Sequence, residues 1–181
     1  MRIPLLVVCW LAAAAGGAAA QTPAAQAPAA QTANVTGITI INTGTYTGNS
    51  VSAPARSGQQ SPTGTVGTDT NWRFVSDSHD VLGKVGTEFG MEFKIDGTPP
   101  GEGVTLYFAI TFPPPGIRNP NTGTVLNTAR IALPNMKIGS RCVVGYGFDN
   151  DWEIVPGLWT LQIWYQDQML AGQNFTVGKV E

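Results

Sequence analysis

The only histidine of the 181-residue chain stands in a short polar run that contains every residue type of a hydrolase triad. Ser76 and Ser78 could each supply a hydroxyl nucleophile, His79 the base, and Asp77 or Asp80 the orienting carboxylate. A triad places its nucleophile and its carboxylate on opposite sides of the imidazole, which usually takes residues from distant segments. Neighbouring Ser and Asp side chains more simply form local turn hydrogen bonds. We therefore interpret this run as a polar turn and predict no catalytic residue in it.

A second group of oxygen-bearing side chains could bind a hard cation, which prefers several oxygen ligands. Its members are Asp149, Asp151 and Glu153. Their spacing departs from the calcium loop of the EF-hand, because Trp152 and residues 154–156 interrupt it. We expect a solvated turn, with a weak surface metal site as the alternative. One histidine and one cysteine in the mature chain cannot supply a usual closed zinc site, so no cofactor is expected.

Cys142 and two glutamates are the other reactive side chains. Cys142 shares a predicted strand face with Val144 and is therefore expected to be a buried small hydrophobe. Glu88 and Glu92 fall on a predicted solvent face, where nothing nearby would raise the pKa of either carboxyl. Paired carboxylates for glycoside cleavage can nevertheless converge from different strands. The sequence leans towards a protein that is not an enzyme, and a deep pocket lined by convergent ionisable groups would favour a hydrolase instead.

Aromatic residues are the last candidates for ligand contact. The phase of its strand assigns Trp159 to the core, whereas Trp164 has the opposite phase and Trp152 lies in the acidic turn. We expect both to pack under a loop or at a sheet edge, with contact to a partner as the alternative. Arg118 and Asn121, in the proline-rich loop 113–123, complete this candidate contact set.

The elements that must position these residues are β-strands, because apolar residues recur with a period of two. The clearest case is the hairpin 156–177, and we predict further strands at 34–47, 72–75, 79–82, 88–95, 104–112, 124–133 and 138–148. Residues 48–69 contain little that is apolar and are predicted to form a long mobile surface loop. About seven to nine short strands with turns between them indicate an all-β fold, an immunoglobulin-like antiparallel β-sandwich, with a small β-barrel as the alternative.

The N-terminus predicts export. Arg2, the apolar residues 3–15 and the small residues 18–20 are typical of a cleaved signal peptide over residues 1–20; a retained anchor is the alternative. Residues 21–33 read as a flexible Ala/Pro/Gln linker, and 34–181 as a single sandwich domain. We expect a periplasmic or extracellular protein without a membrane span after cleavage. Without Arg2 the chain has nine basic and twelve acidic side chains, and no basic stripe that would bind nucleic acid.

Four segments resemble the DUF3859 family of bacterial proteins, which often carry signal peptides and whose function is not established. They are residues 84–91, the loop end 119–123, the run 145–149 and the C-terminal pattern Pro156-Gly157-x-Trp159-(x)3-Ile163-Trp164-Tyr165-(x)4-Leu170-Ala171-(x)3-Phe175-x-Val177. The resemblance covers roughly residues 35–177 and implies the same fold and localisation. It brings no catalytic residues.

Together these features predict a non-catalytic binding or structural module of the bacterial cell envelope that contacts a protein or a glycan. Two alternatives stay open. One is a secreted hydrolase whose carboxylates converge from different strands, and the other is an assembly or chaperone-like helper that lends a sheet edge to an extended partner.

Overall fold

The chain folds almost entirely into β-strands in a computed structural model that describes residues 32–56 and 59–179. Residues 31–181 form a compact unit of their own. The predicted signal peptide and linker residues 21–31 lie outside the described residues. Over the described ranges the only helical turn is the 3-10 helix η1 (Asp151–Glu153), and no helix there is long and apolar enough to cross a membrane.

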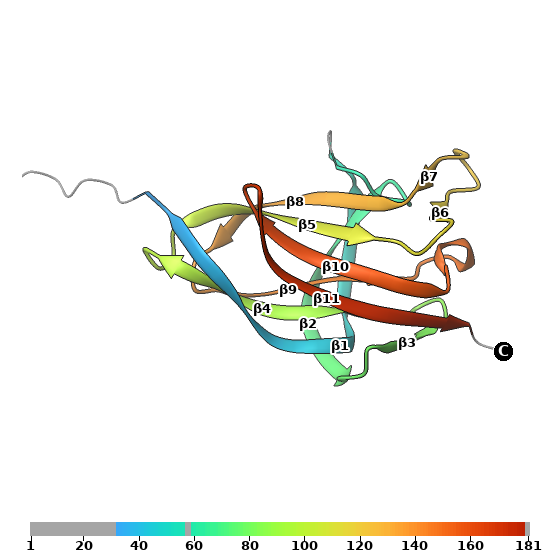
Figure 1. Ribbon diagram of the computed structural model, residues 1–181, viewed down its shortest axis with the longest axis horizontal. Helices are drawn as coiled ribbons and strands as arrows, with labels where there is room; N and C mark the ends of the chain where they lie inside the picture. Colours follow the sequence, from blue (N-terminus) through green and yellow to red (C-terminus); the bar gives the residue numbers. More distant parts are fainter. Residues whose placement is uncertain (1–31, 57–58, 180–181) are drawn as a thin grey trace, which may run out of the picture. The chain divides into compact units, whose positions relative to one another are not determined.

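Two sheets make up the unit, as predicted (Figure 1). The four-stranded sheet has the order β2-β1-β4-β9, with β1 (Asn34–Pro54), β2 (Thr65–Ser76), β4 (Glu88–Thr98) and β9 (Arg141–Gly147). The five-stranded sheet has the order β3-β11-β10-β5-β8, with β3 (Asp80–Gly83), β5 (Gly103–Thr111), β8 (Thr128–Lys137), β10 (Gly157–Tyr165) and β11 (Gln168–Lys179). Both sheets are open at their ends, which makes the fold a sandwich and not a barrel.

All neighbouring strands in these two sheets run antiparallel except β3 and β11, which pair in parallel. A separate two-stranded hairpin of β6 (Ile117–Arg118) and β7 (Val125–Leu126) lies in the predicted proline-rich region. The fold is therefore an antiparallel sandwich with one parallel strand pair at the edge of its larger sheet.

The core forms where the period of two predicted it. The inward-facing residues within 89–95 of β4, 104–110 of β5 and 159–163 of β10 are buried, including Phe89, Phe108 and Trp159. The Phe89 ring of one sheet lies edge-on to the Trp159 ring of the other, with their centroids 5.6 Å apart. Such aromatic pairs bring large buried area and a preferred edge-to-face geometry, so these rings fix how the two sheets face each other.

The predicted loop 48–69 is wrong. Strand β1 continues to Pro54 and β2 begins at Thr65, and the two are paired from Asn49↔Thr70 to Pro54↔Thr65. We call the described residues 49–56 and 59–70 the β1–β2 arm. A register shift between Thr47 and Asn49 and a positive φ of 55° at Asn71 mark where the arm departs from the sheet, because bulges bend and twist a strand pair. The sequence signal failed because neither face of the arm is buried on a sheet, so no apolar alternation was needed.

Candidate functional site: a cleft beneath the β1–β2 arm

A cleft of about 720 Å³ opens at one side of the sandwich, where the four-stranded sheet ends in β9 and the five-stranded sheet ends in β8. The arm forms its third wall. All seven residues of β9 line this cleft, together with residues of β8 and of the arm. Its volume lies within the range of roughly 300–1,000 Å³ that is usual for ligand-binding pockets. We refer to it as the side cleft.

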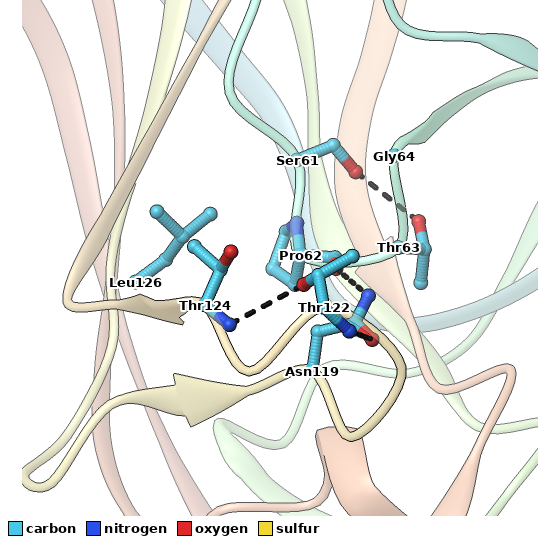
Figure 2. A pocket seen from close by; sticks show the side chains of 8 residues that line it. All are labelled: Ser61, Pro62, Thr63, Gly64, Asn119, Thr122, Thr124 and Leu126. Carbon is cyan, nitrogen blue, oxygen red and sulfur yellow. Dashed lines mark hydrogen bonds between the residues drawn. The ribbon is translucent and has the colours of Figure 1, made fainter.

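Hydrogen bonds hold the arm across this opening. Gln59 Nε2 donates to Ala132 O of β8 at 3.2 Å, and Gln60 N donates to Arg130 O at 3.2 Å. The buried Asn119 donates from Nδ2 to Pro62 O at 2.8 Å, and Figure 2 shows this contact between the arm tip and the β6–β7 hairpin. The arm therefore bridges the two sheets and leaves the cleft beneath it.

A smaller cavity of about 200 Å³ lies beside this contact. Both polar atoms of the Asn119 side chain are engaged within the protein, since its Oδ1 accepts from Asn121 N at 2.8 Å and from Thr122 N at 3.3 Å while Nδ2 donates to Pro62 O. We interpret this place as a structural link between the arm and the β6–β7 hairpin (Figure 2).

The free edge of β9 faces the side cleft. Phe148 N donates to Thr87 O, and Ser140 O accepts from Ile95 N. In an antiparallel pair without a register shift, the even-numbered residues of β9 therefore direct their main-chain groups towards β4, and the odd-numbered residues direct theirs away. The odd-numbered residues are Arg141, Val143, Gly145 and Gly147. Among the described residues, nothing forms a hydrogen bond with their N–H or C=O groups.

The end of the cleft near Gly147 is acidic. Asp69, Glu88, Asp149 and Glu153 all line it. Asp69 accepts from the buried Tyr46 hydroxyl at 2.9 Å. Burial, then the charges of Asp69 and Asp149, raise the pKa of Glu88, and a hydrogen bond from the Gly48 main chain partly offsets this. Within the described ranges no Lys or Arg forms an ion pair with any of these four carboxylates.

Glu153 is the most deeply buried of them, at 1% exposure. Its Oε2 accepts from Tyr146 Oη at 2.6 Å and its Oε1 accepts from Asn150 Nδ2 at 2.8 Å. Burial raises the pKa of Glu153, and these two hydrogen bonds oppose that shift. Burial also raises the pKa of Tyr146, with the neighbouring Glu153 charge adding to it. This carboxyl ties η1 to β9 and forms the floor of the acidic end.

The predicted metal candidates are not gathered around one point. Asp149 and Asp151 are exposed, while Glu153 turns inward to Tyr146 and Asn150. Over the residues that the structure describes, no group of three His, Cys, Asp or Glu side chains is placed to hold a metal ion.

The outer face of β4, which was predicted to be exposed to solvent, also differs from the prediction. Glu92 is buried at 4% exposure, where Arg141 Nη2 lies 2.8 Å from its Oε1 and Asn42 Nδ2 donates to Oε2 at 2.6 Å. Glu88 has a raised pKa, contrary to expectation. Both differences have one cause: β4 is flanked by β1 and β9, and side chains from these neighbours cover its outer face.

The candidate aromatic contacts are half-buried. Trp152 packs against the core. Trp164 lies on the outer face of the five-stranded sheet, where it donates from Nε1 to Gln162 Oε1 at 3.1 Å and has the Arg130 guanidinium 5.9 Å from its ring. Arg118 and Asn121 are exposed at the β6–β7 hairpin. None of the four lines the side cleft.

The serines of the predicted polar turn make local contacts, whereas His79 contacts residues that are distant in the sequence. Ser76 Oγ accepts from Ser78 N at 3.1 Å, and Ser78 Oγ accepts from Asp80 N at 3.0 Å. His79 Nε2 is 2.9 Å from Thr43 Oγ1, and its ring packs on Phe175.

Cys142 is half-buried in the wall of the side cleft, and burial raises the pKa of its thiol.

Sequence reasoning missed the side cleft, although one signal pointed to it. Gly145 and Gly147 stand on the same face of β9, and glycine inside a strand often marks a close approach by other groups. A Cβ at Gly145 would lie 2.7 Å from Tyr46 Oη, and one at Gly147 would lie 3.2 Å from Glu88 Cγ. These glycines allow the acidic end to lie directly against β9.

Comparison with known proteins agrees with this fold. A solved immunoglobulin-like protein from Pseudomonas aeruginosa is 25% identical, with a TM-score of 0.52 over 59% of this chain and 83% of its own. No curated protein sequence matches. The model of the DUF3859 family, described as a domain of unknown function, matches residues 36–177. The chain therefore belongs to the DUF3859 family and has an immunoglobulin-like β-sandwich fold.

Proposed function

We propose that this protein is an exported, non-catalytic binding module that holds an extended polypeptide segment by adding it as a strand to β9. The observation that carries the proposal is the free edge of β9, whose four outward-directed residues line the side cleft and pair with none of the residues that the structure describes. In strand addition, main-chain hydrogen bonds supply affinity and alternate side chains supply specificity. The proposal combines two sequence-based predictions, a module that contacts a protein and a helper that lends a sheet edge.

Two of the three other sheet edges, β3 and β8, fit less well. Strand β3 has only four residues, and β8 already accepts hydrogen bonds from Gln59 and Gln60 of the arm at its free side. Strand β9 offers about 20 Å of edge at roughly 3.3 Å per residue. A segment of about seven residues could pair along its length.

Binding of a selected peptide tests the proposal. Peptides from a displayed library of random heptamers would be selected on residues 31–181, and their affinity compared between the wild type, Val143→Pro and Val143→Ala. Proline removes the outward N–H of Val143, and a proline on an edge strand is tolerated. The alanine variant keeps that N–H. Loss of one main-chain hydrogen bond costs about 0.5–1.5 kcal/mol, and the proline ring adds a steric clash with the incoming strand.

We expect Val143→Pro to weaken binding about tenfold or more and Val143→Ala to have little effect. Amide hydrogen exchange gives an independent readout, because Val143 and Gly145 should become protected when the peptide binds. Equal affinity for the proline variant, or unchanged exchange at both amides, would contradict strand addition at β9.

One observation favours the hydrolase alternative: four carboxyl groups line one cleft. Glu153 is engaged through both of its oxygens, by Tyr146 and Asn150, whereas Asp69 accepts from Tyr46 through one oxygen. Glu88 is the remaining carboxyl with a raised pKa. Hydrolysis of chromogenic glycosides by the wild type that is lost in Glu88→Gln would establish the enzyme and overturn the non-catalytic assignment.

A further inference from the structure

The side cleft extends to both faces of β9, and the residues that line it differ in chemistry between the inner and the outer face. Towards the sandwich interior, the cleft is lined by apolar side chains of β5, β8 and β9: Phe108, Ile110, Ala129, Ile131, Leu133, Met136 and Val144. Their positions follow from the register, which pairs Phe108 with Ile131 and Val144 with Met91, all on the inner faces. The first wall therefore suits apolar side chains.

On the outer side, the cleft is lined by Asp69 and Glu88, and Asp149 follows at the end of β9. Glu88 pairs with Tyr46 and with Gly147 in the register and so lies on the outer face of its sheet, opposite to Phe89. Two arginines line the cleft: Arg141 of β9 is bound to Glu92, and Arg56 of the arm forms no ion pair with Asp69 or Glu88. The negative charge of this wall is thus not neutralised by an ion pair among the described residues.

Resting on the proposed function, we infer that the bound segment alternates apolar and basic residues, with its basic side chains directed to Asp69 and Glu88. A strand in the plane of β9 sends successive side chains to opposite faces, so one set would enter the apolar wall and the other would meet the carboxylates. Opposite charges across an interface contribute specificity and suppress partners of like charge.

The arm argues for a single extended segment and against a second folded copy of this chain. Its tip is hydrogen-bonded to β8 at Arg130 O and Ala132 O, so an occupant of the side cleft must lie beneath the bridge. A lone strand fits such a space, whereas an edge strand that is part of a second sandwich would bring its neighbouring strands and loops against the arm.

Three seven-residue peptides, alternating valine with lysine, threonine or glutamate, test the inference by fluorescence anisotropy on residues 31–181. We expect the lysine peptide to bind at least about tenfold more tightly than the glutamate peptide at low salt, and this preference to shrink at high salt. Glu88→Gln should weaken the lysine peptide about threefold, and Asp167→Asn, a matched change in the remote β10–β11 turn, should not. N-methylation of alternate amides in the peptide, which leaves the protein unchanged, should abolish binding when it falls on the edge that pairs with β9.

The outcomes separate the two proposals. One outcome is that the lysine and threonine peptides bind with equal affinity and that both lose binding on N-methylation and in Val143→Pro. This result overturns the charge preference and leaves strand addition intact. Binding that survives N-methylation of each edge in turn overturns strand addition, because one of the two edges must pair with β9. Concentration-dependent self-association in sedimentation experiments, removed by Val143→Pro, would assign the β9 edge to a second copy of the chain and overturn the inference.

Discussion

The hydrogen bond between Tyr146 and Glu153 is expected to be a major determinant of stability at the floor of the side cleft. Tyr146→Phe removes only the hydroxyl and keeps the ring, which packs with its centroid 5.1 Å from that of Trp159. Glu153, at 1% exposure, would keep one partner, Asn150. Hydrogen bonds to charged groups are worth about 1.5–3 kcal/mol, so we expect a loss of about that size in the free energy of unfolding at a pH where the Glu153 carboxyl is ionised.

The reciprocal change isolates the pair. Glu153→Leu leaves the Tyr146 hydroxyl and the Asn150 amide without their shared acceptor. The free energies of unfolding lost in the two single variants should therefore sum to more than the loss in the double variant. When both partners are replaced by apolar groups, the penalty for an unsatisfied buried group is removed. We expect the double variant to be more stable than the sum of the single changes predicts by about 1–2 kcal/mol.

Urea unfolding followed by tryptophan fluorescence gives these free energies, and a loss of about 1.5–3 kcal/mol corresponds to about 3–12 °C in melting temperature for a domain of this size. Because burial raises the pKa of Glu153, the carboxyl becomes neutral as the pH falls through that raised value, and the cost of Tyr146→Phe should then decrease. Strict additivity of the two single changes, or a cost below about 0.5 kcal/mol for Tyr146→Phe, would refute this reasoning.

Three further changes test the arm and the acidic end. Glu88 has a pKa raised above its ordinary value of 4.5, so the folded state binds this proton more strongly and stability should rise as the pH falls from the raised value towards 4.5; Glu88→Gln should flatten that part of a pH series of urea midpoints. Gly145→Ala places a Cβ against Phe89 O, and we expect it to lower the free energy of unfolding by about 1–3 kcal/mol. Gly37→Ala, where a Cβ meets nothing within 4 Å, should change it by no more than about 0.5 kcal/mol. Asn119→Ala removes the contact with Pro62 and should speed protease cleavage within residues 55–64, and unchanged cleavage would show that this contact does not hold the arm.

The sandwich could be predicted from the sequence because the alternation of apolar and polar residues that indicates each strand lies within a single short segment. In the hairpin 156–177, Trp159, Leu161 and Ile163 alternate with polar residues, and each is fully buried in the structure. A period of two reports directly which face of a strand is covered. The same logic failed for residues 49–54 and 65–70, because a strand pair that buries neither face leaves no such pattern.

The side cleft could not be predicted for a different reason. Its walls come from segments that are far apart in the sequence, around Asp69, Ile131, Val143 and Glu153, and only the sheet order brings them together. The phase of β4 correctly placed Glu88 and Glu92 away from the core. It could not show that β1 and β9 would cover them, since burial on an outer face depends on strand neighbours and not on periodicity.

The arm also explains how the fold tolerates an open edge at β9. An exposed edge strand is a template for pairing with other chains, and proteins usually protect such edges with charge, bulges or a covering segment. Here the covering segment spans from the four-stranded sheet to β8 and leaves a volume of about 720 Å³ beneath it. A segment that served only for protection would be expected to fill this space and to hydrogen-bond with β9. Because the described residues of the arm bridge the edge without pairing to it, the proposed binding of a strand accounts for this geometry better than protection alone.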